Sequence, residues 1–357
     1  MFKTISEPKL LSAPYISVVV TAYDRKDFIL EAVQSVIDQT LERSKYEIIV
    51  VKNYLDEQID EFLKRNNVLN VYTDEKSLGS KLAYGIDKAH GEIVSFLEDD
   101  DLYLPFKLRE VYQVFLENKD IIYFRNEIIP TRKVEEVKNR FSEIEKMAPK
   151  RKTFRISKLN SSRKIFHVQE KYGVANMSSV SVRKSCYQQF SQSMFEINQM
   201  AEFYLFFIGF LTDDQNIISF QEKPLSIWRI HESWTNYDTN TTKRQFLSKN
   251  LEVSKDVALS YENFIKIIAS MSNGSRNVQV LLKNIATRLD GWRAKIKLAE
   301  NIKCNMREIC ALIKSGFYLK DHKILLTVPV SIFSLLSPNY AGKIFRWGLT
   351  REQFHKL

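Results

Sequence analysis

The chain has 357 residues, a net charge of +10 and a hydrophobic content of 44%. This length suits one large domain with an appendage, at roughly 150 residues per domain. Its three cysteines are too few for a disulfide framework, and the spacing of Cys304 and Cys310 matches no common zinc motif. Residues 1–14 lack the pattern of a secretion signal, so we expect a reducing, cytoplasmic setting.

The positive charge points to an anionic partner, but net charge does not separate nucleic acid, anionic lipid and phosphate-bearing substrates. The sequence has no zinc-finger, RNA-recognition or helix-turn-helix signature. We therefore expect no nucleic-acid partner.

The first third of the chain alternates strand and helix patterns. Residues 16–21, ISVVVT, are a β-branched run typical of a strand buried on both faces. The further expected strands are 46–51, 68–72 and 92–97, and the expected helices are 28–39, 56–65 and 81–89. This alternation predicts an α/β fold with a mainly parallel, right-handed wound sheet.

The pattern loosens after residue 104, where we expect a helix at 111–115, strands at 121–124 and 177–182, and an apolar helix at 201–211. Residues 131–164 concentrate charges of both signs, which predicts an exposed insertion or a mobile loop. From about residue 241 the pattern is mostly helical, after a polar, turn-rich boundary at 236–245. The predicted division is an extension at 1–14, an α/β domain at 15–240 with a charged insertion at 131–170, and a helical region at 241–357.

Residues 324–336, ILLTVPVSIFSLL, are apolar but contain Pro329 and are too short to cross a membrane, which takes about 20 residues. Basic residues and a tryptophan flank them: Lys320, Lys323, Lys343, Arg346, Trp347 and Arg351. This region is a candidate for peripheral contact with the inner face of a membrane, for a homo-oligomer interface, or for packing on the protein's own core.

Four consecutive acids, Glu98, Asp99, Asp100 and Asp101, follow directly after the expected strand at 92–97. In open α/β sheets ligands collect at the carboxyl ends of strands, where one or two carboxylates and substrate phosphates hold Mg²⁺. The run predicts a metal site, with a solvated acidic turn as the alternative.

Four stretches in order resemble a family 2 glycosyltransferase of the GT-A fold. They are residues 17–40, with the opening strand and its Tyr-containing turn; 79–103, with Gly-x-Lys and the acids; 176–183, NMSSVSVR; and 228–231, WRIH. The resemblance implies a nucleotide-sugar donor, Mg²⁺ or Mn²⁺, and direct displacement with inversion onto a saccharide or lipid-linked acceptor. It leaves the donor nucleotide open among UDP, GDP and dTDP.

The resemblance also assigns roles on the donor side. Tyr23 is expected to stack on the base, with Asp24 and Arg25 beside it at the same edge of the donor site. Lys81 is expected to lie near the diphosphate. The alternative for Tyr23 is a cap on the hydrophobic core.

Among the acids, Asp100 is the preferred metal ligand and Glu98 the partner of the donor ribose. A second register uses Asp99 and Asp101 instead. His231 is expected to complete the diphosphate end as a ligand or hydrogen-bond donor, with a structural histidine as the alternative.

Three positions depart from the family pattern, and the smallest departure is Glu98 in place of the first Asp of the metal motif. The turn after the second strand is Lys52-Asn53-Tyr54 in place of Asp-Asp-Gly-Ser, so Asn53 stands where a carboxylate accepts the uracil imide proton. The Glu-Asp pair that supplies the general base is replaced by Glu202-Phe203, which leaves Glu202 as the expected base and Glu196 in reserve. The alternative for Glu202 is a residue favoured at a helix start.

Two other function classes compete with an active transferase. One is a non-catalytic GT-A protein that binds nucleotide sugar or scaffolds an active partner, as the changes at Asn53 and Phe203 suggest. The other, a nucleotidyltransferase, is disfavoured because the loop after the first strand, TAYDRKD, has no glycine. The insertion at 131–164 is the expected determinant of acceptor choice.

Overall fold

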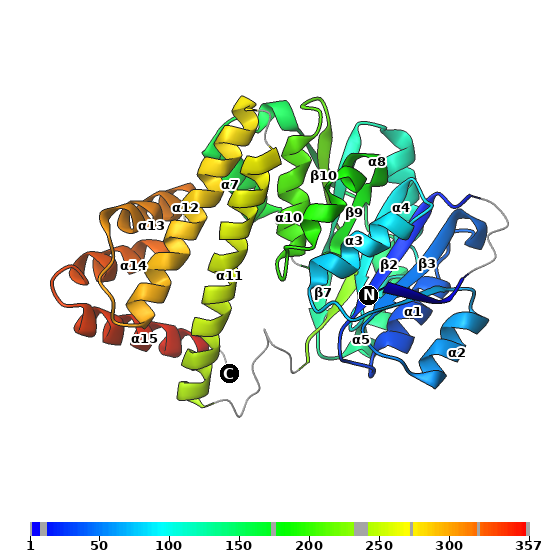
Figure 1. The fold of residues 1–357 in the computed structure, drawn as a ribbon, viewed down its shortest axis with the longest axis horizontal. Helices are drawn as coiled ribbons and strands as arrows, with labels where there is room; N and C mark the ends of the chain where they lie inside the picture. The colour runs from blue at the N-terminus through cyan, green and yellow to red at the C-terminus, as the bar shows by residue number, and fades with distance from the viewer. Residues whose placement is uncertain are drawn as a thin grey trace. The chain divides into compact units, whose positions relative to one another are not determined.

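The computed structural model describes residues 2–7, 13–172, 176–231, 242–271, 274–319 and 322–354. The chain divides into two compact units (Figure 1). Unit 1 comprises Met1–Lys158 and Val174–Ile230, and unit 2 comprises Leu159–Gly173 and His231–Leu357.

Unit 1 is built on a sheet whose strands run in the order β1-β4-β3-β2-β5-β9-β7-β10-β6, with β8 also paired to β10. The strands are β1 (Phe2–Ser6), β2 (Ile16–Ala22), β3 (Tyr46–Lys52), β4 (Leu69–Thr73), β5 (Ile93–Glu98), β6 (Leu102–Tyr103), β7 (Ile121–Thr131), β8 (Arg151–Arg155), β9 (Val180–Arg183) and β10 (Ile217–Arg229). The central run β4-β3-β2-β5 is parallel, and β10 is parallel to β7. The expected α/β fold with a wound sheet is confirmed.

The direction of the strands determines where a ligand site can form. β9 is antiparallel to both β5 and β7, so these two strands point the same way. The carboxyl ends of β2, β3, β5 and β10 therefore lie at one edge of the sheet, the edge at which open α/β sheets bind ligands.

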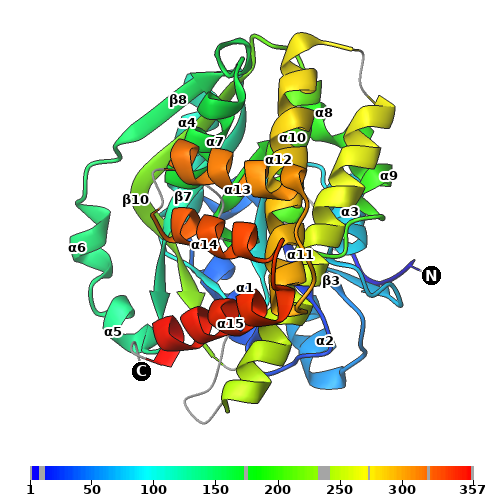
Figure 2. The ribbon, with the colours of Figure 1, turned by 90° about the vertical axis from the view of Figure 1, so that its left-hand side faces the viewer.

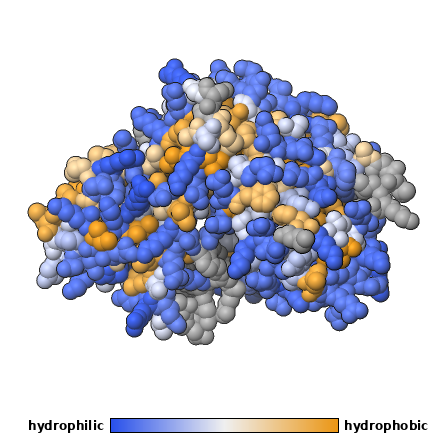
Figure 3. Space-filling view, viewed as in Figure 1, coloured by the Kyte–Doolittle hydropathy of each residue, from blue (hydrophilic) through white to orange (hydrophobic). Residues whose placement is uncertain are grey.

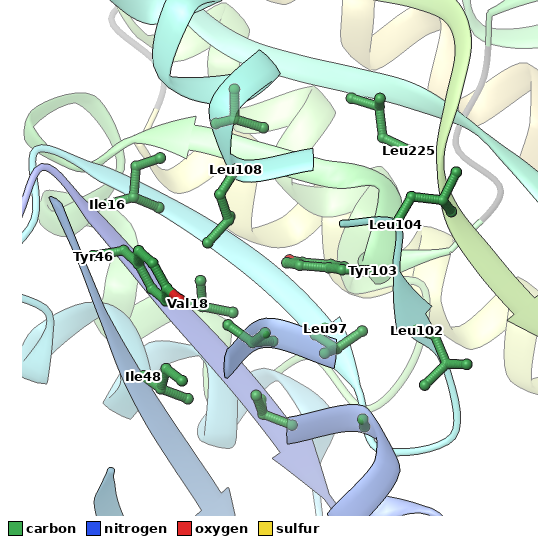
Figure 4. Close-up of a cluster of buried hydrophobic side chains, with 14 of the residues drawn as sticks. Ile16, Val18, Tyr46, Ile48, Leu97, Leu102, Tyr103, Leu104, Leu108 and Leu225 are labelled. Carbon is green, nitrogen blue, oxygen red and sulfur yellow. The ribbon is translucent and has the colours of Figure 1, made fainter. Parts of the chain in front are cut away.

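The β-branched sequence of β2 explains why this strand is central. Successive side chains of a strand point to opposite faces. Val18 and Val20 join the core cluster shown in Figure 4, together with residues of the helices α1 (Ile29–Ile37) and α4 (Lys107–Glu117). Val19 points to the other face, where one of its methyl groups would lie 2.3 Å from a Cβ at Gly85. The helix α3 (Leu78–Lys88) can therefore pack closely on this face only because residue 85 is glycine.

The larger helices of unit 1 are α1 (Ile29–Ile37), α2 (Glu57–Arg65), α3 (Leu78–Lys88), α4 (Lys107–Glu117) and α10 (Ala201–Ile208). Short helices also occur at α8 (Lys184–Tyr187) and α9 (Ser191–Met194). The Ser77 hydroxyl accepts a hydrogen bond from the Ser80 N–H at 3.1 Å and caps the start of α3. All the helices expected between residues 28 and 115 are present.

Of the two alternatives predicted for residues 131–164, an exposed insertion or a mobile loop, the loop is wrong, whereas most charged side chains of the segment are exposed. This segment contains α5 (Val134–Lys138), α6 (Phe141–Glu145), strand β8 and the start of α7 (Ser162–Lys171). β8 pairs with β10 in the sheet, and the Lys138 ammonium contacts Glu31 of α1 at 2.9 Å. The charges of this segment therefore lie on ordered elements.

Unit 2 is helical in the residues described. It contains α7, α11 (Lys243–Met271), α12 (Arg276–Ala299), α13 (Met306–Leu319), α14 (His322–Phe333) and α15 (Pro338–Phe354). Figure 2 shows α13, α14 and α15 as neighbouring helices. A cluster that includes Leu298, Leu312, Ala341 and Phe345 forms their core. In the described part of the chain, no helix is both long and apolar enough to cross a membrane.

The boundary predicted at 236–245 lies largely outside the described residues. The extension predicted at 1–14 contributes a strand, since Phe2–Ser6 pair antiparallel with β4 as β1. The segment expected at 324–336 forms most of α14, which contains Pro329, and the turn after it.

Candidate functional site

The predicted site residues of unit 1 gather at the carboxyl edge of the sheet. Tyr23, Asp24 and Arg25 follow β2, and Asn53 follows β3. Glu98 ends β5, and Asp99, Asp100 and Asp101 form the turn after it. The topology thus brings together side chains from three adjacent parallel strands.

Arg25 joins the loop after β2 to the acidic turn. Its Nη2 atom contacts a carboxylate oxygen of Asp99 and lies 2.8 Å from Oδ2 of Asp100. Burial raises the pKa of Asp99 to about 6, against the opposing effect of Arg25. One guanidinium therefore neutralises two of the four acids.

Asp101 is turned into the protein. Its Oδ1 accepts the backbone N–H of Arg229 at 3.1 Å, and its Oδ2 accepts the Nδ2–H of Asn176 at 2.5 Å. Burial, followed by the charge of Asp100, raises the pKa of Asp101 to about 8. These bonds give Asp101 a structural role in the turn, and its role as a metal ligand stays a prediction.

Arg229, at the end of β10, is a site residue that the sequence analysis did not single out. Besides its bond to Asp101, its Nε donates to the backbone oxygen of Asp100 at 3.0 Å. Its guanidinium also contacts Glu31 and lies 4.6 Å from the centre of the Phe28 ring. The only signal in the sequence was its position in WRIH.

A buried lysine supports the turn from within the fold. The Nζ atom of Lys107 donates to the Ser178 carbonyl oxygen at 2.5 Å and to the Ser226 hydroxyl at 3.0 Å. The Ser178 hydroxyl in turn accepts the backbone N–H of Glu98 at 3.0 Å. Burial lowers the pKa of Lys107 well below its usual range, while the charge of Asp101 opposes this shift. The sequence analysis did not identify Lys107 either.

Asn53 and Asp24 are joined by two hydrogen bonds. The Asn53 Oδ1 atom accepts the backbone N–H of Asp24 at 2.8 Å, and its Nδ2 atom donates to the Asp24 carboxylate at 2.7 Å. Asp24 has a φ of 50°, in the left-handed region. The pair therefore fixes the loop that carries Tyr23 and Arg25, and a contact of Asn53 with a nucleobase stays a prediction.

Lys81 and Tyr23 form a second pair at this edge. The Lys81 Nζ atom lies 4.7 Å from the centre of the Tyr23 ring and donates to the carbonyl oxygens of Glu75 and Lys76 at 2.9 and 3.2 Å. Burial lowers the pKa of Lys81 to about 8. Tyr23 is 43% exposed, which argues against the alternative that it caps the core.

Glu202, in the first turn of α10, is close enough to the acidic turn for its charge to act on Glu98. Burial, followed by the charges of Asp101, Asp100 and Glu202, raises the pKa of Glu98 well above its usual range. Burial also raises the pKa of Glu202 itself to about 7. Glu196, the reserve candidate, is exposed. The role of Glu202 as the base, with Glu196 in reserve, stays a prediction.

The backbone around Glu202 is tied to the helix that carries Lys81. Gly79 of α3 donates its N–H to the Ile197 carbonyl oxygen at 3.0 Å. A Cβ at this glycine would lie 2.0 Å from the backbone oxygen of Met194. Met200, which precedes α10, has a φ of 58°. A close glycine contact and a left-handed residue thus set the position at which α10 begins.

The acidic turn fits a divalent cation that binds one or two carboxylates here and takes its other ligands from substrate phosphates and water. No group of three or more His, Cys, Asp or Glu side chains arranged to hold a metal is found among the described residues. However, Oδ2 of Asp99 is buried without a hydrogen-bond partner, and the Asp100 side chain is 17% exposed beside it. One or two such carboxylates with phosphate oxygens and water make a typical Mg²⁺ site.

His231 lies two residues after Arg229, the last residue of β10. Its side chain is partly buried. Its role at the diphosphate end of the site stays a prediction.

Comparisons with known proteins agree with this geometry. Residues 17–176 match the family model described as glycosyl transferase family 2. An uncharacterised glycosyltransferase of Rickettsia typhi is 30% identical over 116 residues, which are 31% of this chain and 36% of the relative. The O-antigen biosynthesis glycosyltransferase WbnJ of Escherichia coli is 27% identical over 109 residues, 29% of this chain and 42% of the relative.

A solved structure extends the likeness in fold. S. aureus TarS 1-349, crystallised in complex with UDP, superposes with a TM-score of 0.55 at 14% identity, covering 94% of this chain and 91% of the other. By contrast, the match spans only 36%, 17% and 21% of the length of the first three curated relatives.

Proposed function

Because residues 17–176 match the model of glycosyl transferase family 2 and the fold is similar to that of TarS, we propose that the protein is an inverting glycosyltransferase. It transfers a sugar from a nucleoside diphosphate sugar to a saccharide or lipid-linked acceptor. The observation that carries this proposal is the contact of Arg25 with Asp99 and Asp100 after β5, together with the influence of the Glu202 charge on Glu98 of the same edge. In the proposal, Arg25 serves the departing diphosphate and Glu202 the attacking hydroxyl.

On the donor side, the exposed Tyr23 ring offers a stacking surface for the nucleobase. Arg25 and the Lys81 ammonium supply positive charge for the diphosphate. Glu98 is the candidate partner of the ribose. UDP heads the donors to be tested because the TarS crystal structure contains it, followed by GDP and dTDP.

Asp99 and Asp100 are the residues that would hold Mg²⁺ or Mn²⁺. A bound divalent cation would supply Lewis-acid stabilisation for the charge that grows on the departing diphosphate. Arg229 and Asn176 would keep the turn in place through Asp101.

On the acceptor side, the Glu202 carboxylate takes the proton from the attacking hydroxyl. The acceptor oxygen forms a bond to the anomeric carbon while the bond from that carbon to the diphosphate oxygen breaks. Attack from the face opposite the diphosphate inverts the configuration. A pKa of about 7 suits this task, because a general base works best when its pKa lies near the operating pH.

The second candidate function is a non-catalytic protein that binds nucleotide sugar or scaffolds an active partner. Residue 53 favours it, because an asparagine stands where the family has a carboxylate that binds uracil. The Asn53 side chain is instead hydrogen-bonded to Asp24. The presence of Phe203 after Glu202 favours it as well.

A transfer assay separates the two functions. The purified chain is incubated with Mn²⁺, one nucleotide sugar at a time, and saccharide or lipid-linked acceptors, and glycosylated product is detected by mass spectrometry. The proposal predicts acceptor-dependent product that Asp100→Asn abolishes and that Glu202→Gln reduces by about 10²-fold or more. Nucleotide-sugar binding without product for any acceptor would support the non-catalytic function, and product from Glu202→Gln at the wild-type rate would remove Glu202 as the base.

A further inference from the structure

The last two helices of unit 2 carry an exposed apolar face. We name it the α14–α15 face, and it consists of Ile332, Phe333, Leu336, Tyr340, Ile344 and Trp347. Leu336 is 86% exposed, Tyr340 63% and Trp347 56%. Figure 3 shows hydrophobic side chains gathered at the left-hand end, over the connection between α14 and α15. Contiguous exposed apolar residues of this size usually mark a binding surface.

The face is separate from the residues that hold unit 2 together. Tyr340, Ile344 and Trp347 recur at helical spacing, so they share one side of α15. Ala341 and Phe345, on another side of the same helix, pack in the unit 2 core. The exposed residues are therefore not needed for the core, and their exposure calls for another explanation.

The sequence that carries this face is positively charged. Lys343 lies on α15 beside the exposed apolar residues, and its Nζ atom is 5.4 Å from the centre of the Tyr340 ring. Residues 302–357 contain nine Lys and Arg against three Asp and Glu, a net charge of +6 out of +10 for the whole chain. A helix with aromatic and aliphatic residues on one side and basic residues beside them is typical of segments that lie in a membrane interface.

We propose that the α14–α15 face docks on the surface of an anionic lipid bilayer. Tyr340, Ile344 and Trp347 enter the boundary between head groups and acyl chains, and Lys343 binds the lipid phosphates. The charge argues against a second copy of the chain as the occupant, because two faces of net positive charge repel each other. This inference is independent of the proposed transferase activity, since lipid binding needs neither donor nor acceptor.

The test is co-sedimentation of the full chain with vesicles of phosphatidylcholine alone and of phosphatidylcholine with about 30% phosphatidylglycerol. We expect binding to the anionic vesicles, weakened by salt, and little binding to phosphatidylcholine. The variant Ile344→Ser/Trp347→Ser should bind the anionic vesicles with an affinity reduced by about tenfold or more, because it removes two large apolar side chains from the interface. Lys343→Glu should weaken binding to the anionic vesicles only.

The matched control is Leu116→Ser, which removes a side chain of α4 in unit 1 that is 51% exposed. It should leave vesicle binding unchanged. Circular dichroism melting of each variant checks the fold, and Lys343→Glu keeps the test valid if the double variant is unstable. Absence of wild-type binding to anionic vesicles would overturn the proposal, as would equal binding by Ile344→Ser/Trp347→Ser.

Light scattering after size-exclusion chromatography tests whether a second copy of the chain occupies the α14–α15 face instead. If the wild type is a dimer and Ile344→Ser/Trp347→Ser is a monomer, the face binds a second copy and the lipid proposal is wrong. Equal binding to both vesicle types, unaffected by Lys343→Glu, would contradict the choice of an anionic surface.

Discussion

The Nη2 atom of Arg25 lies 2.8 Å from Oδ2 of Asp100 and also contacts Asp99. The guanidinium thus serves as the counter-ion of the two carboxylates proposed to hold a divalent cation. A cation and Arg25 compete for the negative charge of the same two carboxylates, whereas a diphosphate offers Arg25 new acceptors. Metal and nucleotide should therefore bind cooperatively.

Replacing Arg25 tests this competition. Arg25→Met should raise the affinity for Mn²⁺ without nucleotide by about tenfold, equivalent to about 1.4 kcal/mol, because the carboxylates lose a competing cation. It should also weaken nucleoside diphosphate binding in the presence of Mn²⁺. Calorimetry measures both. Lys26→Met is the control, since it removes the same charge from the next residue, whose ammonium contacts Asp56 at 2.9 Å. Equal Mn²⁺ affinities for all three proteins would contradict the competition.

Removing the carboxylate of Glu202 tests the base. Glu202→Gln should reduce sugar transfer by about 10²- to 10⁴-fold, the usual contribution of a general base, and leave nucleoside diphosphate affinity unchanged. Glu196→Gln, at the exposed reserve candidate, should keep nearly full transfer. Initial rates with saturating donor provide the measurement. Loss of activity in Glu196→Gln alone would reverse the assignment.

The pH dependence of transfer follows from the same residue. Burial raises the pKa of Glu202 to about 7, and only the deprotonated carboxylate accepts a proton. The value of kcat/KM should therefore rise with pH through about 7 and level off above it, and the rising limb should disappear in Glu202→Gln. A profile of the wild type that is flat between pH 5.5 and 8 would be inconsistent with Glu202 as base, as would one that falls across this range.

Gly79 predicts a stability effect that also reports on the site. Gly79→Ala should lower the melting temperature by several degrees, because its Cβ would meet the Met194 carbonyl oxygen at 2.0 Å and the Ile197 carbonyl oxygen at 2.6 Å. Gly291→Ala is the matched control within α12, where a Cβ would meet no atom within 4 Å. This control should be neutral or stabilising by up to about 1 kcal/mol. A melting temperature unchanged in Gly79→Ala would mean that the α3–α9 contact is not tight.

The central strands were predictable because their signal is local. β2 and β3 contain the β-branched runs VVVT and IIVV, which are typical of strands buried on both faces. The acids after β5 were predictable for a related reason, since an abrupt change from apolar to acidic residues marks the end of a buried strand.

The edge elements could not be predicted in the same way. β1 and β8, with the sequences FKTIS and RKTFR, show no buried face, and they are strands because β4 and β10 offer pairing partners. The mobile loop expected at 131–164 was a misinterpretation of this kind, since its charges lie on elements that tertiary contacts order.

Three parts of the site depend on contacts between distant residues. Arg229 reaches the acidic turn from β10, Lys107 supports it through Ser178, and Asn53 is engaged by Asp24. Sequence alone specifies the chemistry of such residues but not the partner that each will meet in the fold.

The most direct test of the account is calorimetric titration of the full chain with UDP, GDP, dTDP, CDP and ADP, with and without Mn²⁺, for the wild type, Asp100→Ala and the exposed control Asp87→Ala. We predict that one nucleotide binds tightly only with Mn²⁺, that Asp100→Ala abolishes this binding, and that Asp87→Ala retains it. Binding of no nucleotide under any condition would contradict the proposed donor site, as would metal-dependent binding that survives in Asp100→Ala.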